Sequence, residues 1–196
     1  MIKDIFKTSI FITNLNLDLE HYTKKCEIYC ENNKRVIKSN EGGYQSDNLD
    51  LKNWKELVNA IEQSVNSEAD NYYPLITGTK DSLKVGNMWI NINNNAHFNR
   101  YHIHPNSKLA GVYYIQTPEN CGDLNFERPD VDSISYYKSY DSEHDKIVDE
   151  NTFSEVNVPA KENKIVLFPP YIRHMVKPNL NLSYSRISIS FNMVRK

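Results

Sequence analysis

The sequence has little of what would place it in a membrane, nucleic-acid-binding or secreted class. It contains no run of 18 apolar residues and no signal-peptide pattern at its start, so we expect no membrane span and a cytoplasmic location. Its formal net charge is only −2, which gives no general reason to expect nucleic-acid binding. Only three cysteines occur among 196 residues, and this small number suits a reducing compartment.

Two of the cysteines, Cys26 and Cys30, lie four positions apart in a predicted helix, and His21 is close to them in sequence. These three side chains are too few for a structural zinc site, which takes four ligands. We therefore interpret both cysteines as buried or half-buried thiols.

The chain also lacks internal repeats and low-complexity linkers. Its length is enough for one well-packed domain and short for two, so we expect a single domain over residues 1–196. In this domain residues 1–83 support a core that is formed by residues 84–196. An acidic, tyrosine-rich insertion at 128–154, with a short strand at 134–137, interrupts the core pattern. We interpret the insertion either as a lid or as a solvated acidic loop.

The N-terminal part carries two helical patterns. Asn14–Asn16 is predicted to cap a helix over 17–31, and Asp50 opens a stronger amphipathic helix over 51–70 that braces a sheet from outside. The other elements predicted here are a weak strand at 3–13 and a glycine-containing turn at 39–46.

From residue 84 onward, apolar residues recur with a period of two, which is typical of strands. The predicted strands at 88–93 and 184–193 each have one aliphatic face and one polar face. The aliphatic face suits packing against helices, and the polar face suits a cavity. We therefore expect a mainly β protein with flanking helices, built as a barrel or sandwich. The other predicted strands lie at 108–116, at 122–127, from Val156 and at 164–168.

Three of the six histidines fall into two short motifs, at 101–105 and 168–174. His102 and His104 stand at i and i+2, and such residues on a strand point to the same face. His174, from a distant strand, completes a group of three. Neutral imidazoles bind iron, zinc, copper or nickel, so the group predicts a mononuclear metal site with open positions. His97 either supports the ligands from behind or replaces one of the three as an alternative ligand, whereas His21 and His144 are expected at the surface.

Twelve residues after His174, Arg186 lies on the polar face of the last predicted strand. A guanidinium binds a carboxylate through two parallel hydrogen bonds. Ser188 and Asn93 can add hydrogen bonds in the same cavity. This combination suits a small dicarboxylate that chelates the metal at one end and forms a salt bridge at the other.

Residues 86–193 resemble the 2-oxoglutarate/iron(II) oxygenases, close to the prolyl hydroxylases in motif order and similar to a bacterial and phage group. The resemblance implies a double-stranded β-helix core, a jelly roll of the cupin-like kind. The motifs that carry it are residues 39–46, His102–Ser107 followed by Gly111–Tyr114, Leu167–Pro169 before His174, and Arg186–Asn192.

By this resemblance, His102 and His174 are iron ligands and Arg186 holds the distal carboxylate of 2-oxoglutarate. Asn93 stands where related enzymes often carry a tyrosine that helps to bind the cosubstrate. The sequence departs from the family at His104, where an aspartate or glutamate is usual. A neutral ligand leaves the iron site one negative charge short, so we expect weaker Fe(II) binding.

The implied activity is that of a dioxygenase, which converts 2-oxoglutarate and O2 to succinate and hydroxylates a substrate. The substrate is a protein, a small molecule or a nucleotide, and Tyr113, Tyr114, Tyr171 and the insertion are candidate contacts by location. One alternative is a cupin-like three-histidine metalloenzyme that does not use 2-oxoglutarate. Another is a non-catalytic β-helix module that binds a partner, and a homodimer is left open.

Overall fold

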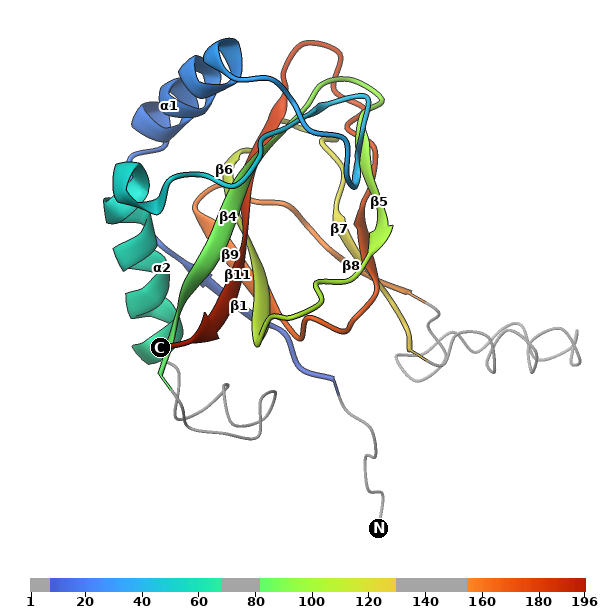
Figure 1. Cartoon of the computed structure of the whole chain (residues 1–196). Coiled ribbons are helices and arrows are strands. Elements are labelled where there is room, and N and C mark those ends of the chain that lie inside the picture. Colours follow the sequence, from blue (N-terminus) through green and yellow to red (C-terminus); the bar gives the residue numbers. More distant parts are fainter. Residues whose placement is uncertain (1–7, 68–81, 130–154) are drawn as a thin grey trace, which may run out of the picture.

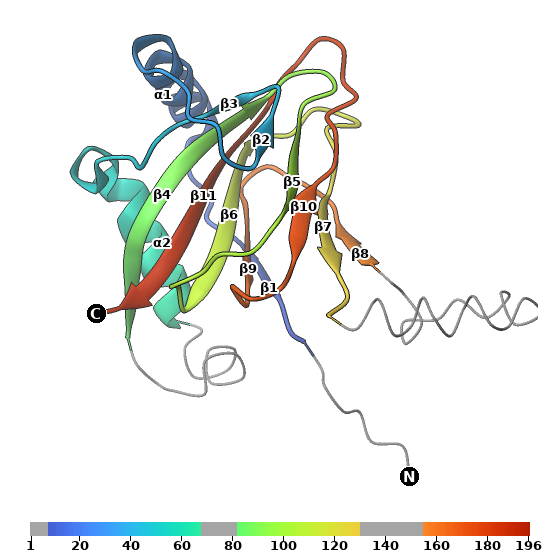
Figure 2. The same ribbon diagram turned by 45° about the vertical axis from the view of Figure 1, so that its right-hand side comes forward.

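The computed structural model describes residues 8–67, 82–129 and 155–196. The strands form two sheets that face one another as opposed layers, with all pairs antiparallel (Figure 2). The six-stranded sheet has the order β1-β9-β6-β11-β4-β3, and the five-stranded sheet has the order β2-β5-β10-β7-β8. The elements are β1 (Phe11–Asn14), α1 (Leu19–Asn32), β2 (Asn40–Glu41), β3 (Tyr44–Gln45), the 3-10 helix η1 (Leu51–Trp54), α2 (Lys55–Ser67), β4 (Leu83–Asn93), β5 (Phe98–His102), β6 (Leu109–Gln116), β7 (Leu124–Glu127), β8 (Glu155–Val158), β9 (Lys164–Phe168), β10 (His174–Val176) and β11 (Arg186–Arg195).

Both helices cover the outer face of the six-stranded sheet (Figure 1). The apolar stripe of α2 is buried at Leu57, Ile61 and Val65, and it packs in the same cluster as the aliphatic face of β4. The prediction of an amphipathic bracing helix is therefore confirmed, although residues 68–70 lie outside the described part. For α1 the predicted cap was wrong, because the side chain of Asp18 accepts a hydrogen bond from the His21 N–H.

The cysteines of α1 occupy the environments that were expected. Cys26 is buried and Cys30 is half-buried, and both are free thiols. Burial raises the pKa of each thiol, so both stay protonated at neutral pH.

The strands β4 and β11 divide their side chains between two environments, as their sequences predict. Met88 and Ile90 of β4, and alternate residues of β11 from Ile187 to Met193, join the cluster under the helices. Their other faces turn toward the five-stranded sheet, where Asn91 and Ser188 line a cavity. The space between the sheets is therefore polar where these two strands face it.

The turn at 39–46 joins the two sheets. Its first arm, β2, pairs with β5 of the small sheet, and its second arm, β3, pairs with β4 of the large sheet. Asn40 and Asn93 exchange side-chain hydrogen bonds of 3.0 and 3.5 Å across this junction. A Cβ on Gly43 would lie 2.5 Å from the side-chain oxygen of Asn40, so glycine is needed at that position.

The first strand, predicted over residues 3–13, is shorter in the described part, where β1 begins at Phe11. Other expectations concern residues outside the described part: residues 3–7 of that strand, the strand at 134–137, the two interpretations of the insertion, and His144. The single domain, the cytoplasmic location and the homodimer stay predictions. Among the described helices, none is long and apolar enough to cross a membrane.

Candidate active site

Two of the three predicted metal ligands are placed by strand pairing. His102 is the last residue of β5 and His174 is the first residue of β10, and the two are direct partners in the antiparallel register. His104 lies beyond the end of β5, so the prediction that it shares a strand with His102 was wrong. Its backbone N–H instead donates to the Pro170 carbonyl, 2.9 Å away, which holds it beside the segment that leads into β10.

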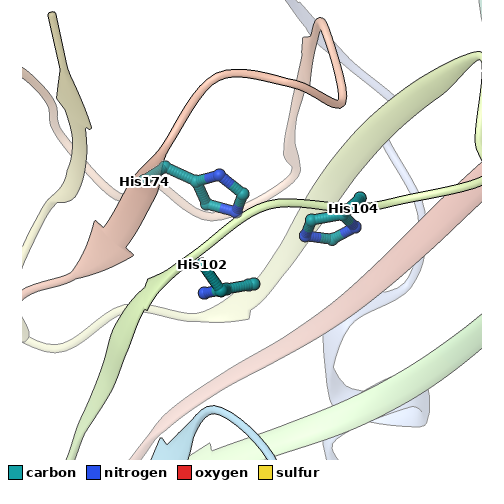
Figure 3. Close-up of side chains that lie close together, drawn as sticks. All are labelled: His102, His104 and His174. Atoms are coloured by element: carbon teal, nitrogen blue, oxygen red, sulfur yellow. The ribbon is translucent and has the colours of Figure 1, made fainter. Parts of the chain in front are cut away.

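The three side chains nevertheless converge on one space (Figure 3). One ligand atom from each of His102, His104 and His174 lies within 4.8 Å of the other two. Metal–nitrogen bonds of about 2.1 Å allow at most about 4.2 Å between two ligand nitrogens. A small inward movement therefore suffices for all three to reach one ion.

The tautomers of His102 and His174 are fixed by backbone carbonyls. The Nδ1–H of His102 donates to the Arg100 carbonyl at 2.7 Å, and that of His174 donates to the Ile172 carbonyl at 2.9 Å. A carbonyl oxygen only accepts, so the proton must be on Nδ1. The Nε2 lone pair of each ring is thereby left for a metal ion.

His104 has the same arrangement with a side chain as the acceptor. Its Nδ1 lies 2.6 Å from Oδ1 of Asn192, and its Nε2 is buried with no hydrogen-bond partner among the described residues. A buried polar atom without a partner is costly unless a ligand satisfies it. The position of this atom, close to the other two histidines, fits a cation.

Burial also keeps the three imidazoles neutral. It lowers the pKa of His102, lowers that of His104 to about 4, and lowers that of His174 well below its ordinary value. Neutral imidazole is the form that binds metal. The site therefore needs no deprotonation step at neutral pH.

His97, the alternative ligand, lies outside this group. Its Nδ1 accepts a hydrogen bond from the Asn94 N–H at 3.1 Å, and its ring lies against Gly42. It therefore stabilises the turn after β4.

Two hollows adjoin the histidines. The inner cavity, between the sheets, has a volume of about 20 Å³, whereas the outer pocket has a volume of about 580 Å³. Both are lined by Ser39, Trp89, His102 and His104. The inner cavity also contacts His174, Ser188, Asn91 and Asn99, and the outer pocket contacts Gln45, Asn48, Asn87, Arg100, Tyr101 and Asn192.

Arg186 lies at the start of β11, on the same polar face as Ser188, and its side chain is 1% exposed. Its Nη1 donates to the carbonyls of Cys121, Gly122 and Lys177, the last at 3.0 Å. Its Nη2 is buried and has no partner among the described residues. A buried guanidinium with a free donor fits an anion.

Tyr114, one of the candidate substrate contacts from the sequence, is 1% exposed. Its hydroxyl is also buried without a partner in the described residues, and it is close enough to Arg186 for the two groups to affect each other's pKa. The alternation of β6 held the signal, because Tyr114 shares a face with Val112 of the cavity lining and Tyr113 points to the opposite cluster.

The expected hydrogen-bonding residues Asn93 and Ser188 have different positions. Ser188 lines the inner cavity, as expected. Asn93 is opposite Arg186 in the register of β4 and β11, but its side chain is bound to Asn40 and lines neither hollow.

The family model described as "Putative 2OG-Fe(II) oxygenase" matches residues 87–192, which is more than half of the chain. The chain belongs to this family of 2-oxoglutarate/Fe(II) oxygenases. The protein is therefore an oxidoreductase of a family whose cofactors are Fe(II) and 2-oxoglutarate, as expected. No curated protein sequence matches the chain.

Solved structures confirm the fold of the oxygenase. A Pseudomonas putida prolyl-4-hydroxylase has a TM-score of 0.62 at 12% identity, over 96% of this chain and 94% of that chain. A Trichoplax adhaerens prolyl hydroxylase in complex with a hypoxia-inducible-factor peptide has a TM-score of 0.59 at 13% identity, over 95% and 83%. HygX from Streptomyces hygroscopicus, with nickel and 2-oxoglutarate bound, has a TM-score of 0.57 at 8% identity, over 96% and 84%. The expected double-stranded β-helix is thus confirmed.

Proposed function

We propose that the oxygenase binds Fe(II) through His102, His104 and His174 and hydroxylates its substrate beside this ion. One atom of O2 enters the substrate hydroxyl and the other enters succinate, which forms from 2-oxoglutarate with release of CO2. Two observations carry the proposal: Nε2 of His104 is buried without a partner among the described residues, and one ligand nitrogen from each of the three histidines lies within 4.8 Å of the other two. The bound iron supplies the oxygen chemistry, and the protein supplies binding, orientation and shielding.

The distal carboxylate of 2-oxoglutarate binds between Arg186 and Tyr114 in this proposal. Both residues present a buried donor that has no partner in the described part of the chain, and Ser188 lines the cavity two residues along β11 from Arg186. The inner cavity of about 20 Å³ has room for about one water molecule. Side chains around it must therefore move apart when the cosubstrate enters.

The substrate reaches the metal from the outer pocket. Among the described residues, no acidic side chain lines this pocket, and its two cations are paired with carboxylates: Arg100 with Glu41 at 2.7 Å and Lys38 with Asp47 at 3.7 Å. The remaining lining is rich in amides, with Trp89 and Tyr101 as aromatic walls. This pocket suits a neutral substrate that forms hydrogen bonds.

An anaerobic titration of the Fe(II)-loaded protein with 2-oxoglutarate tests the proposal. We expect a visible charge-transfer band that saturates with 2-oxoglutarate. His174→Ala removes the band, whereas the control His97→Gln keeps it because His97 lies outside the ligand group. Bound iron without a band would favour the three-histidine metalloenzyme that does not use 2-oxoglutarate. Absence of iron binding would favour the binding module.

A further inference from the structure

Asn192 differs from the other groups that orient the three histidines. His102 and His174 donate their Nδ1–H to backbone carbonyls, but His104 donates to the side-chain oxygen of Asn192 at 2.6 Å. We propose that Asn192 is the positioning residue that makes His104 a metal ligand. This inference rests on the proposed metal site. It assigns to Asn192 the role of holding His104 in the Nδ1–H tautomer, which leaves Nε2 for the metal.

The need for such a residue follows from the position of His104. His102 and His174 are held by the pairing of β5 with β10, whereas His104 comes from the segment after β5. Two hydrogen bonds hold its backbone: its N–H donates to the Pro170 carbonyl, and its own carbonyl accepts from the Ser107 hydroxyl at 2.7 Å. Neither bond fixes the rotation of the ring.

Among the described residues, the aromatic side chains beside the His104 ring make no hydrogen bond to it, so they do not select its tautomer. Its centroid lies 5.6 Å from that of Trp89 and 6.0 Å from that of Phe168. Asn192 provides the directional contact, because its oxygen accepts the Nδ1 proton and leaves the lone pair on Nε2. A ring with its proton on Nε2 could not bind the metal through that atom.

Asn192 stands on the polar face of β11, immediately before the point where the pairing with β4 shifts register. The residue that pairs with Asn192 on the neighbouring strand β4 is Asn87. Asn87 lines the same outer pocket, but its side chain donates to Asn48 and not to a histidine. Asn87 is therefore a matched control for an Asn→Leu change in this pocket. The amide of Asn192 also leaves the ligand set neutral, whereas an aspartate would accept the same proton and add a negative charge.

The tautomer can be measured without metal, by nitrogen-15 NMR of labelled histidines in the full-length protein. We expect a proton on Nδ1 of His104 in the wild type and in Asn192→Asp, and a change toward the Nε2–H form in Asn192→Leu. Asn87→Leu leaves the His104 signals unchanged. An Nδ1–H tautomer that persists in Asn192→Leu would overturn the inference.

Cobalt(II) titration of the same variants, followed by absorption, reports the consequence for metal binding. Asn192→Leu should lower the affinity by about 10- to 100-fold, the usual range for an outer-shell partner of a ligating histidine. Asn192→Asp should bind at least as tightly as the wild type, and Asn87→Leu should stay within about 3-fold. If Asn192→Leu does not fold, Asn192→Asp and Asn192→Ser, which both keep an acceptor, must still bind cobalt, and weak binding by both would contradict the inference.

The two measurements separate the inference from the proposed function. If the wild type binds no cobalt but shows the expected tautomers, the metal site fails and Asn192 still orients His104. If His104→Ala weakens cobalt binding and Asn192→Leu does not, the metal site holds and the role of Asn192 is overturned.

Discussion

His102 and His174 face one another directly across the antiparallel pair of β5 and β10, and their ring centroids are 4.4 Å apart. Their distance is therefore set by the backbone ladder. A shift of one residue in this register would turn one imidazole to the opposite face of the sheet. Two ligands are thus fixed by the fold, whereas the third depends on local contacts.

The neutral ligand set makes the binding of metal and cosubstrate interdependent. Three imidazoles contribute no negative charge. The chelating carboxylate of 2-oxoglutarate brings one negative charge to the metal, and its distal carboxylate offsets the charge of Arg186. We expect 2-oxoglutarate to raise the affinity for Fe(II) or Co(II) by about 10-fold or more, and the metal to raise the affinity for 2-oxoglutarate by the same factor. Calorimetric titration in both orders measures this coupling. Glutarate, which lacks the 2-oxo group, is the control, and equal enhancement by glutarate would contradict chelation.

Tyr114→Phe should have opposite effects on stability and on cosubstrate binding. Its hydroxyl is buried without a partner in the described residues, so its removal leaves the unfolding free energy unchanged or raises it by up to about 1 kcal/mol. The same change removes a donor from the proposed carboxylate site and weakens 2-oxoglutarate binding by about 10-fold. Urea unfolding and 2-oxoglutarate titration measure the two effects.

The adjacent tyrosine is the control for that prediction. Tyr113 points to the helix side of β6, and its hydroxyl donates to Asn163 at 2.7 Å. Tyr113→Phe should lower stability by about 1 kcal/mol and leave 2-oxoglutarate binding unchanged. Equal effects of both changes on cosubstrate binding would remove Tyr114 from the proposed site.

The sequence alone was informative where the relevant pattern is local. Alternation along β4 and β11 predicted an aliphatic face and a polar face, because neighbouring side chains on a strand point to opposite sides. It did not predict the route by which His104 reaches the site, since a loop beyond a strand has no such periodicity. The grouping of Tyr114 with Arg186 was missed for a related reason: it depends on how two strands pair in space.

Gly122→Ala should damage the support of Arg186. Gly122 has a φ of 83°, and an added Cβ would lie 2.2 Å from the Lys177 carbonyl, which accepts a hydrogen bond from Arg186. We expect a loss of about 1 to 3 kcal/mol in stability and weaker 2-oxoglutarate binding. In the control Gly86→Ala, the atom nearest to the added Cβ is in the side chain of Val194 at 2.9 Å and no carbonyl lies closer than 3.5 Å, so this change should cost less stability. An unchanged affinity in a folded Gly122→Ala variant would show that this carbonyl support is dispensable.

Variants of Asn40 and Asn93 distinguish two roles of Asn93, binding the cosubstrate or stabilising the fold. Both side chains are buried, and they join the turn at 39–46 to β4. Asn40→Ala and Asn93→Ala should each lower the unfolding free energy by about 1 to 3 kcal/mol, because the first removes the acceptor of the Asn93 side-chain N–H and the second removes the donor to Oδ1 of Asn40. The double variant should cost less stability than the sum of the two single variants, since the shared bonds are lost only once.

Urea unfolding measures this double-mutant cycle, and 2-oxoglutarate titration of the same proteins tests the cosubstrate role. An affinity loss of about 10-fold in Asn93→Ala but not in Asn40→Ala would make Asn93 a direct contact, whereas equal and small losses would make it a support of the turn.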